Sequence, residues 1–324
     1  MKLAPLLLLA TALTLTAETE EKLVKRFVVQ PGGTVVVDVD FGSVDVSTSA
    51  ANEVVVDVLR RVTRASEAEE QEFLADRPVT ITPEGDTVTI SSRPQAPRKS
   101  SSSSGKQSTE AKYTITVPAK FNAQLKTAGG TVSVSDLTGD VKAASNGGSL
   151  QFTRLHGALD GATAGGPIQV ADCEGEQQVK TSGGKIDVTG GKGSFDGKTS
   201  GGPVSVKDFH GAVQVKTSGG KIVVDNVAGK VDGKTTGGGI EASFASPPSD
   251  EVNLFTSGGG VTLRVPENAA FDLDAATSGG NVNSDLAVES TGKPSRDHLK
   301  GPVNGGGKSI VLRTTGGSIR LQKQ

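Results

Sequence analysis

Apolar and polar residues alternate along most of the chain, in short segments that recur at equal intervals. Alternation with a period of two places successive side chains on opposite faces of a β-strand. The first set of apolar pairs is Val132/Val134, Leu150/Phe152, Ile168/Val170, Ile186/Val188, Val204/Val206 and Ile222/Val224. A second set lies between them, at Val141/Ala143, Leu159/Gly161, Gln177/Val179, Phe195/Gly197, Val213/Val215 and Val231/Gly233. This pattern predicts many short strands, each with one buried face.

Glycine divides these strands at a fixed spacing. Gly-Gly pairs begin every 18 residues, at Gly129, Gly147, Gly165, Gly183, Gly201, Gly219 and Gly237. Single glycines keep the same step, at Gly139, Gly157, Gly175, Gly193, Gly211 and Gly229. Tight turns often need a positive φ, which glycine adopts without steric cost. Each unit of 18 residues therefore reads as one coil with two strands and two glycine-bearing turns.

The exact repetition favours stacked parallel coils over a meander of hairpins. In a stack, each residue lies about 4.8 Å from its counterpart in the next coil, so like residues meet. The second strand of each coil ends in a hydroxyl that shares the inward phase: Ser145, Thr163, Thr181, Thr199, Thr217 and Thr235. We predict an all-β fold, a parallel β-solenoid (a single-stranded β-helix) with about 18 residues per coil.

The rest of the chain departs from this regularity. Residues 1–17 have a charged start, an apolar stretch and a small-residue exit, which predicts a cleaved signal peptide and a mature chain without a transmembrane segment. Residues 18–97 read as irregular N-terminal coils and a cap, with a short helix near 66–75 that opens on a capping box at Ser66. The Ser-rich segment 98–112 is expected to be a disordered loop. The solenoid is expected over 113–324, with regular coils at 129–238 and then longer coils, in sequence order, to the C-terminus.

Composition narrows the classes of function. Aromatic residues are 3% of the chain, and 34 basic residues balance 36 acidic ones. Nucleic-acid binding is therefore disfavoured, because few aromatic side chains are available to stack on bases and no net positive charge attracts phosphate groups. The single cysteine, Cys173, occupies the slot of Leu137 and Leu155 in other coils and is expected to be a buried apolar side chain rather than a nucleophile. No cofactor is predicted.

Polar residues of the outward phase are the candidates for function. Four lysines are expected to form one row, the candidate contact surface: Lys180, Lys198, Lys216 and Lys234. Asp160, Asp196 and Asp232 recur only every second coil, and we expect the neighbouring lysines to neutralise them. Polysaccharide lyases and hydrolases on β-helices use acidic clusters on adjacent coils, and glycoside hydrolysis needs two carboxylates about 5 to 10 Å apart. A solvated mixed-charge face is the favoured interpretation, so no catalytic residue is assigned.

Metal binding is not expected either. His156 and His210 share one phase three coils apart, roughly 14 Å, which is too far for one metal ion. Calcium-binding β-rolls also have Gly-Gly repeats, but the slot of their aspartate holds an apolar residue here, such as Val134 or Val170.

The opening segment 41–46 (FGSVDV), the recurring Thr-Ser-Gly-Gly-x-Ile/Val-x-Val units and the closing segment 312–321 (LRTTGGSIRL) carry a family resemblance. The chain resembles the bacterial putative-adhesin family of exported β-strand-repeat proteins, a domain of unknown function. The resemblance covers nearly the whole mature chain and supplies no catalytic residues.

These observations lead to an expected function. We expect a non-enzymatic exported protein, adhesin-like or a scaffold, that presents repetitive solenoid faces at the cell envelope, whether periplasmic, on the cell surface or extracellular. Its partner would be a polysaccharide or another envelope protein. Two alternatives stay open: a polysaccharide-active β-helix enzyme, either a lyase or a hydrolase, and a structural solenoid that self-assembles end to end.

Overall fold

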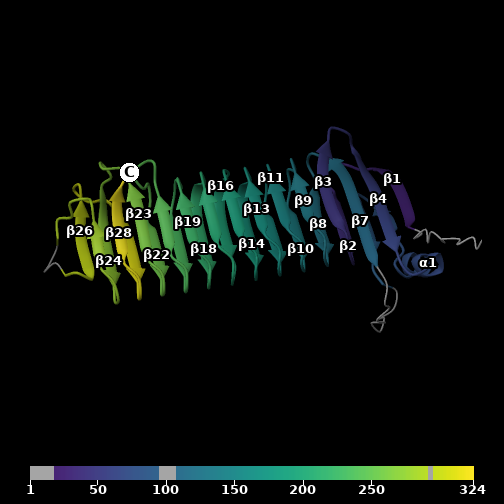
Figure 1. Ribbon diagram of the computed structural model, residues 1–324. Helices are drawn as coiled ribbons and strands as arrows, with labels where there is room; N and C mark the ends of the chain where they lie inside the picture. Colours follow the sequence, from purple (N-terminus) through teal and green to yellow (C-terminus); the bar gives the residue numbers. More distant parts are fainter. Residues whose placement is uncertain (1–17, 95–106, 291–294) are drawn as a thin grey trace, which may run out of the picture.

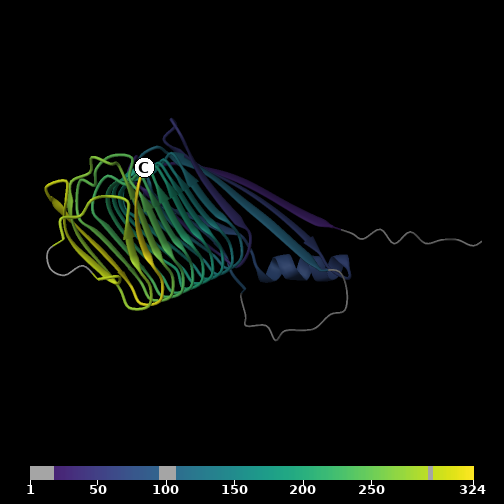
Figure 2. The ribbon, with the colours of Figure 1, turned by 60° about the vertical axis from the view of Figure 1, so that its left-hand side comes forward.

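The structure is a computed structural model that describes residues 18–94, 107–290 and 295–324. The predicted signal peptide and residues 98–106 of the predicted loop lie outside the described residues. Two long sheets face each other along one axis (Figure 1; Figure 2). The buried apolar side chains form a core between them. Within the described ranges there is one helix, α1 (Glu67–Asp76), so the all-β prediction with a short N-terminal helix is confirmed.

Each sheet has 14 strands among the described residues. In spatial order, sheet A contains β1 (Thr19–Val28), β4 (Glu53–Thr63), β7 (Ser108–Pro118), β3 (Ser43–Ser49), β9 (Val132–Ser135), β11 (Leu150–Thr153), β13 (Ile168–Ala171), β15 (Ile186–Thr189), β17 (Val204–Lys207), β19 (Ile222–Asp225), β21 (Ile240–Ser243), β23 (Val261–Val265), β28 (Ile319–Lys323) and β25 (Val282–Ser284).

Sheet B contains β26 (His298–Val303), β24 (Phe271–Thr277), β27 (Lys308–Thr314), β22 (Val252–Thr256), β20 (Val231–Thr235), β18 (His210–Thr217), β16 (Lys192–Lys198), β14 (Glu174–Thr181), β12 (Leu159–Thr163), β10 (Val141–Ser145), β8 (Asn122–Thr127), β2 (Thr34–Val39), β6 (Thr87–Ser92) and β5 (Thr80–Glu84). Every regular coil contributes one strand to each sheet, and the core lies between them.

The middle of the molecule confirms the parallel solenoid. Val141 pairs with Leu159 in sheet B, and Leu150 pairs with Ile168 in sheet A, so each residue meets the residue 18 positions further along the chain. Large inward side chains are matched by small ones. A Cβ placed on Gly197 would lie 2.6 Å from the Cε1 atom of Phe195, which shows that the phenyl ring occupies the space above this glycine.

The paired glycines are required for a reason different from the one predicted. No residue of the seven Gly-Gly pairs that recur every 18 residues has a left-handed φ, whereas the single glycines such as Gly139 do, with a φ of 148°. The second glycine of each regular pair lies directly under a carbonyl oxygen of the preceding coil, as Gly202 does under Gly184. Any Cβ there would overlap that oxygen, so close backbone approach, and not a positive φ, selects glycine at this position.

The predicted inward hydroxyls satisfy the backbone at the same corner. Thr181 is 2% exposed; its Oγ1 donates to the carbonyl of Gly166 at 3.0 Å and accepts from the amide of Gly184 at 3.1 Å. Equivalent bonds are made by Thr163, Thr199 and Thr217. Each threonine thus joins its own turn to the turn of the previous coil, and no buried hydroxyl of this set lacks a partner.

At the C-terminal end, the prediction that coils stack in sequence order is wrong, and the N-terminal coils are also out of sequence order. The last coil, β27 with β28, lies between the coil of β22 and β23 and that of β24 and β25. At the other end, the early coil of β2 and β3 lies between the strands β6 and β7 and the strands β8 and β9. The hydrophobic pattern of a coil fits any position in the stack, so it does not fix which coils become neighbours.

The N-terminal cap combines antiparallel strands with the helix. The amide of Glu69 donates to Ser66 Oγ at 3.3 Å, which is the predicted capping interaction. The ring centroids of Phe73 and Phe41 are 5.7 Å apart. The Cζ atoms of Arg64 and Arg77 lie 4.2 and 4.4 Å from the centroid of the Phe73 ring.

One predicted boundary of this region is wrong. Residues 108–112, expected to be loop, are the start of strand β7, because they pair antiparallel with the end of β4, where Ser108 lies opposite Thr63. No helix among the described residues is long and apolar enough to cross a membrane.

Candidate contact surface

The four lysines of the predicted contact surface lie in one row on the outer face of sheet B. The parallel register pairs Lys180 with Lys198, Lys198 with Lys216, and Lys216 with Lys234. All four side chains point away from the core, and adjacent strands place them about 4.8 Å apart at the backbone. The structure therefore brings together, in order, the residues that the 18-residue spacing aligns.

The lysines differ in what they contact. Lys198 Nζ lies 2.6 Å from a carboxylate oxygen of Asp196, and Lys234 Nζ lies 5.3 Å from the ring centroid of Phe255. For Lys180 and Lys216, no carboxylate oxygen of the described residues lies within 4.0 Å. Among the described residues, two ammonium groups of the row thus have no carboxylate partner, while the other two contact neighbours on the same sheet.

The row is longer than the sequence reasoning found. Towards the N-terminus, Lys126 on β8 has the same outward phase, with Ala144 and Ala162 between it and Lys180. Towards the C-terminus, Phe255 on β22 follows Lys234, and Arg313 on β27 follows Phe255. The signal was present: each of these residues directly precedes the threonine of a Thr-x-Gly-Gly turn. Counting steps of 18 back from Lys180 reaches Lys126, but only an alignment of the turns finds Phe255 and Arg313, because the coil of Phe255 is 21 residues long.

Phe255 and Arg313 add an aromatic ring and a guanidinium group to the row of ammonium groups on this face. Phe255 is 43% exposed, and it is the one aromatic residue among the exposed large hydrophobic residues of the described chain. The Arg313 guanidinium is paired with Asp274, at 2.8 Å, and this contact holds the pKa of the Asp274 carboxyl below its usual range. The lysine row therefore ends at an exposed aromatic ring followed by a neutralised arginine.

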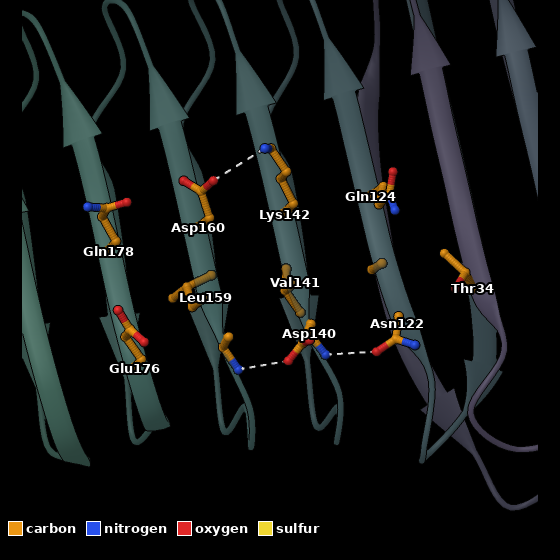
Figure 3. A pocket seen from close by; sticks show the side chains of 12 residues that line it. Thr34, Asn122, Gln124, Asp140, Val141, Lys142, Leu159, Asp160, Glu176 and Gln178 are labelled. Atoms are coloured by element: carbon orange, nitrogen blue, oxygen red, sulfur yellow. Dashed lines mark hydrogen bonds and ion pairs between the residues drawn. The ribbon is translucent and has the colours of Figure 1, made fainter.

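A shallow groove of about 700 Å³ runs beside the row across the strands from β2 to β14 (Figure 3). Its lining includes the outward residues Asn122, Gln124, Lys142, Asp160 and Gln178. Gln178 lies two residues before Lys180 on the same face of β14, so the groove borders the row. A second hollow of about 290 Å³ shares Glu176 and Gln178 with it and continues the groove towards β20.

Polar side chains in the groove are tied to one another from coil to coil (Figure 3). Asn122 Oδ1 accepts from the amide of Asp140 at 3.0 Å, and Asp140 Oδ1 accepts from the amide of Ala158 at 3.1 Å. The Lys142 ammonium lies 3.5 Å from the carboxylate of Asp160. The groove is thus lined by amides and by charges of both signs, and its shape is fixed by the backbone ladder beneath.

The acidic residues do not form the predicted pairs throughout. Asp196 is neutralised by Lys198, as predicted, but Asp160 is paired with Lys142 of the preceding coil and not with Lys180. The reason is reach: in register, Lys142 lies directly opposite Asp160 on the neighbouring strand. Within the described ranges, no three His, Cys, Asp or Glu side chains come together as a metal site would require.

The histidines and the cysteine occupy structural positions. His156 Nδ1 lies 3.2 Å from Glu174, which also contacts Lys192, and the Lys192 hydrogen bond and then that of His156 lower the pKa of this carboxyl. His298 contacts Asp274 at 3.1 Å. Cys173 is 1% exposed, and burial raises the pKa of its thiol, which makes it a poor nucleophile, as predicted.

The described residues thus form a two-sheeted parallel β-solenoid with a row of lysines on the outer face of one sheet. The model of the Toastrack DUF4097 family matches residues 36–322, and the chain belongs to this family. This confirms the family resemblance of the sequence.

Three solved structures are similar to this chain at low identity. They are a putative cell adhesion protein from Clostridium sporogenes (10% identity, TM-score 0.22, covering 94% of this chain and 100% of that one), a putative adhesin from Bacteroides fragilis (11%, TM-score 0.34, 94% and 97%) and a putative adhesin from Parabacteroides merdae (12%, TM-score 0.34, 94% and 96%). No curated protein matches the chain.

Proposed function

We propose that this protein is an exported, non-enzymatic, adhesin-like scaffold of the cell envelope that binds an acidic linear polysaccharide along the outer face of sheet B. The observation that carries the proposal is the register that holds Lys180, Lys198, Lys216 and Lys234 in one row. Membership of the Toastrack family and the adhesin names of similar structures agree with this role.

Repetition supplies the binding energy. An exposed lysine contributes little to affinity by itself, because solvent and salt screen its charge. A polymer with a repeating acidic group engages several lysines of the row at once, and each further contact is made at high effective concentration. Lys180 and Lys216 are the strongest candidates, because neither has a carboxylate partner among the described residues within 4.0 Å.

Phe255 provides a contact of a different kind. Its exposed ring lies at the end of the row, where Lys234 already approaches it. The carbon–hydrogen face of a sugar ring is apolar and packs against an aromatic face, which is how an aromatic residue distinguishes a polysaccharide from an inorganic polyanion. The amide side chains of the adjoining groove, such as Gln178, add hydrogen-bonding groups for sugar hydroxyls.

The test is retention of the protein on a panel of immobilised acidic and neutral polysaccharides, with cleavage products measured in parallel. We expect retention on an acidic polymer that weakens as salt is raised. The double substitution Lys180→Glu and Lys216→Glu should weaken it about tenfold or more, because two attractive contacts become repulsive. Phe255→Ala should weaken binding to polysaccharide but not to polyphosphate.

Lys207 gives the matched control. It is an exposed lysine on β17, but it faces outward from sheet A, on the opposite side of the molecule. Lys207→Glu changes the net charge in the same direction as either single substitution in the row and should leave retention unchanged. Equal losses for Lys207→Glu and Lys180→Glu would contradict a site on sheet B.

The enzyme alternative has its own outcome in this experiment. Release of oligosaccharides by the wild-type protein, abolished by Asp160→Asn or Asp196→Asn, would identify a hydrolase or lyase and overturn the non-enzymatic proposal. Export is tested separately by recovering the protein from the envelope fraction and determining its N-terminus. We expect the mature chain to begin at Glu18, directly before β1.

A further inference from the structure

The described part of the molecule has four sheet edges, and three of them are blunted. An open edge presents unpaired backbone groups that recruit further strands. At the C-terminal end, β25 has only three residues, and β26 contains Gly301 and Pro302. At the N-terminal end, β5 has five residues and contains Pro83. Short strands and proline are the usual means of preventing edge-to-edge association.

The fourth edge, strand β1, is neither short nor interrupted by proline, although it carries five charged side chains. It runs for ten residues without proline or glycine and pairs on one side only, with β4. It lies at the outer margin of the sheet (Figure 1; Figure 2). Val24 and Val28 are 53% and 86% exposed, and they are two of the three exposed large hydrophobic residues in the described chain. A hollow of about 570 Å³ between its first residues and α1 leaves space beside it.

The charges of β1 are arranged so that the strand complements a second copy of itself. Its sequence is TEEKLVKRFV, with acidic residues near the start and basic residues near the end. In an antiparallel pair centred on Leu23, Glu20 lies opposite Arg26 of the second copy, and Glu21 lies opposite Lys25. Each contact occurs twice because the arrangement is twofold symmetric. Residues directly opposite each other share one face of a sheet, so these charges are neighbours.

We propose that two copies of the chain associate through antiparallel pairing of β1, which joins their A sheets into one continuous sheet. The contact is isologous and therefore closes as a dimer instead of propagating into a fibre. In this register Val24 lies opposite Lys22 of the second copy, so its exposed side chain packs beside the second strand. This inference does not depend on the proposed ligand, because β1 lies at the capped end and is not part of the lysine row.

The contacts of β1 within its own chain are compatible with this pairing. Glu20 contacts Arg61 at 3.0 Å and Arg26 contacts Glu53 at 3.0 Å, both on β4. These ion pairs are largely exposed, so they contribute little on their own, and each side chain has room to bridge two strands. The buried Arg60, which Glu21 pairs with, should be left intact in any test.

The test uses two charge reversals on the outer face of β1 and their mixture. The protein, in the form that cells produce, is examined by sedimentation over a concentration series, and we expect a monomer–dimer equilibrium. Glu20→Lys and Arg26→Glu should each raise the dimer dissociation constant about tenfold or more, because each creates two like-charge contacts. An equimolar mixture of the two variants should form heterodimers as readily as the wild type, because all four contacts become attractive again.

Controls separate this contact from general destabilisation. Arg61→Ala removes the partner of Glu20 within the chain and should leave the dimer intact. At concentrations where the wild type is monomeric, each variant should have the same melting temperature as the wild type. Hydrogen exchange in 19–28 should slow as the wild-type concentration rises. A wild-type protein that stays monomeric up to its solubility limit would overturn the proposal, and so would a mixture of the two variants that fails to associate.

Discussion

The regular middle of the solenoid and its two ends use the same coil but join it differently. In the middle, Thr181 donates to a carbonyl 15 positions earlier in the chain. In the last coil, Thr314 makes the same bond to Gly259, 55 positions away, and near the N-terminus Thr127 makes it to Gly42, 85 positions away. The local chemistry is identical, while the length of chain that must be closed to form it differs several-fold.

The contacts that stabilise a pair of stacked coils therefore do not determine the order in which the coils stack. A middle coil closes a short loop on a coil just formed, so it can add step by step. A terminal coil inserts between two others and closes a long loop. The entropy of closing this loop is lost before the coil makes its stabilising contacts. We therefore expect the middle to form first and the interleaved ends to seal it afterwards.

Removing the terminal coil should have the largest effect, and it should be confined to the C-terminal end of the molecule. Deletion of residues 308–324 leaves β24 without its parallel partner and exposes β22 and β23 as open edges. Hydrogen exchange should show residues 252–303 losing most of their protection, while β11 to β19 keep theirs. A chain lacking only residues 323–324 is the control. Uniform loss of protection along the molecule would mean that the ends and the middle unfold as one unit.

Next in size is the corner glycine of the middle coils. Gly202→Ala puts a Cβ onto the carbonyl oxygen of Gly184, and we expect a loss of about 3 kcal/mol or more in the free energy of unfolding. The neighbour Gly201 is the matched control, because a Cβ there meets no atom closer than 3.7 Å. Gly201→Ala should cost about 1 kcal/mol or less. Denaturant unfolding measures both, and equal losses would contradict the close-approach explanation.

Removing one threonine hydroxyl from the corner of a coil should have an intermediate effect, in the middle as at the end of the stack. Thr181→Val keeps the shape but removes one donor and one acceptor, which leaves a buried carbonyl and a buried amide without that partner. We expect a loss of about 1 to 3 kcal/mol. Thr314→Val removes the equivalent bonds at the end of the stack. Its effect should be concentrated in the exchange of the C-terminal strands, and a loss spread over the whole chain would argue against a separately sealed end.

The smallest effect concerns pH at the C-terminal end. The contacts of Asp274 with Arg313 and His298 lower the pKa of its carboxyl. A carboxyl whose pKa is lower in the folded state adds stability above its ordinary pKa of about 4, and this stability is lost as the pH falls. Asp274→Asn should therefore be less stable than the wild type at pH 7 and approach it below about pH 4. A difference that does not change over this range would rule out the ion pair as its cause.

The sequence predicts the repeating interior well, because each repeat carries its own evidence. The alternation around Val179, the hydroxyl of Thr181 and the slot of Cys173 all have the burial that the 18-residue phase indicates. The same reasoning misses Phe255, because its coil is 21 residues long and a fixed step passes over it. Counting residues works only where turns do not change length.

The order of the coils at the ends could not be predicted from the same pattern. The closing unit with Ile319 and Leu321 would bury its side chains equally well beside several coils. What selects its place is the competition among whole coils for neighbours, together with the antiparallel strands β26 and β1 that finish each end. Residues 108–112 were misread for a related reason: a polar, Ser-rich stretch becomes a strand when β4 is already there to pair with it.

The interleaved ends have one further consequence, for how the molecule can change in size. Because each terminus is sealed by its own local arrangement, a pair of coils can be duplicated or deleted in the middle without disturbing either seal. Each such event would alter the reach of the molecule by about 10 Å, two rungs of the ladder. The length of the solenoid can therefore change during evolution in fixed steps of two coils, while the arrangement of strands at both ends stays the same.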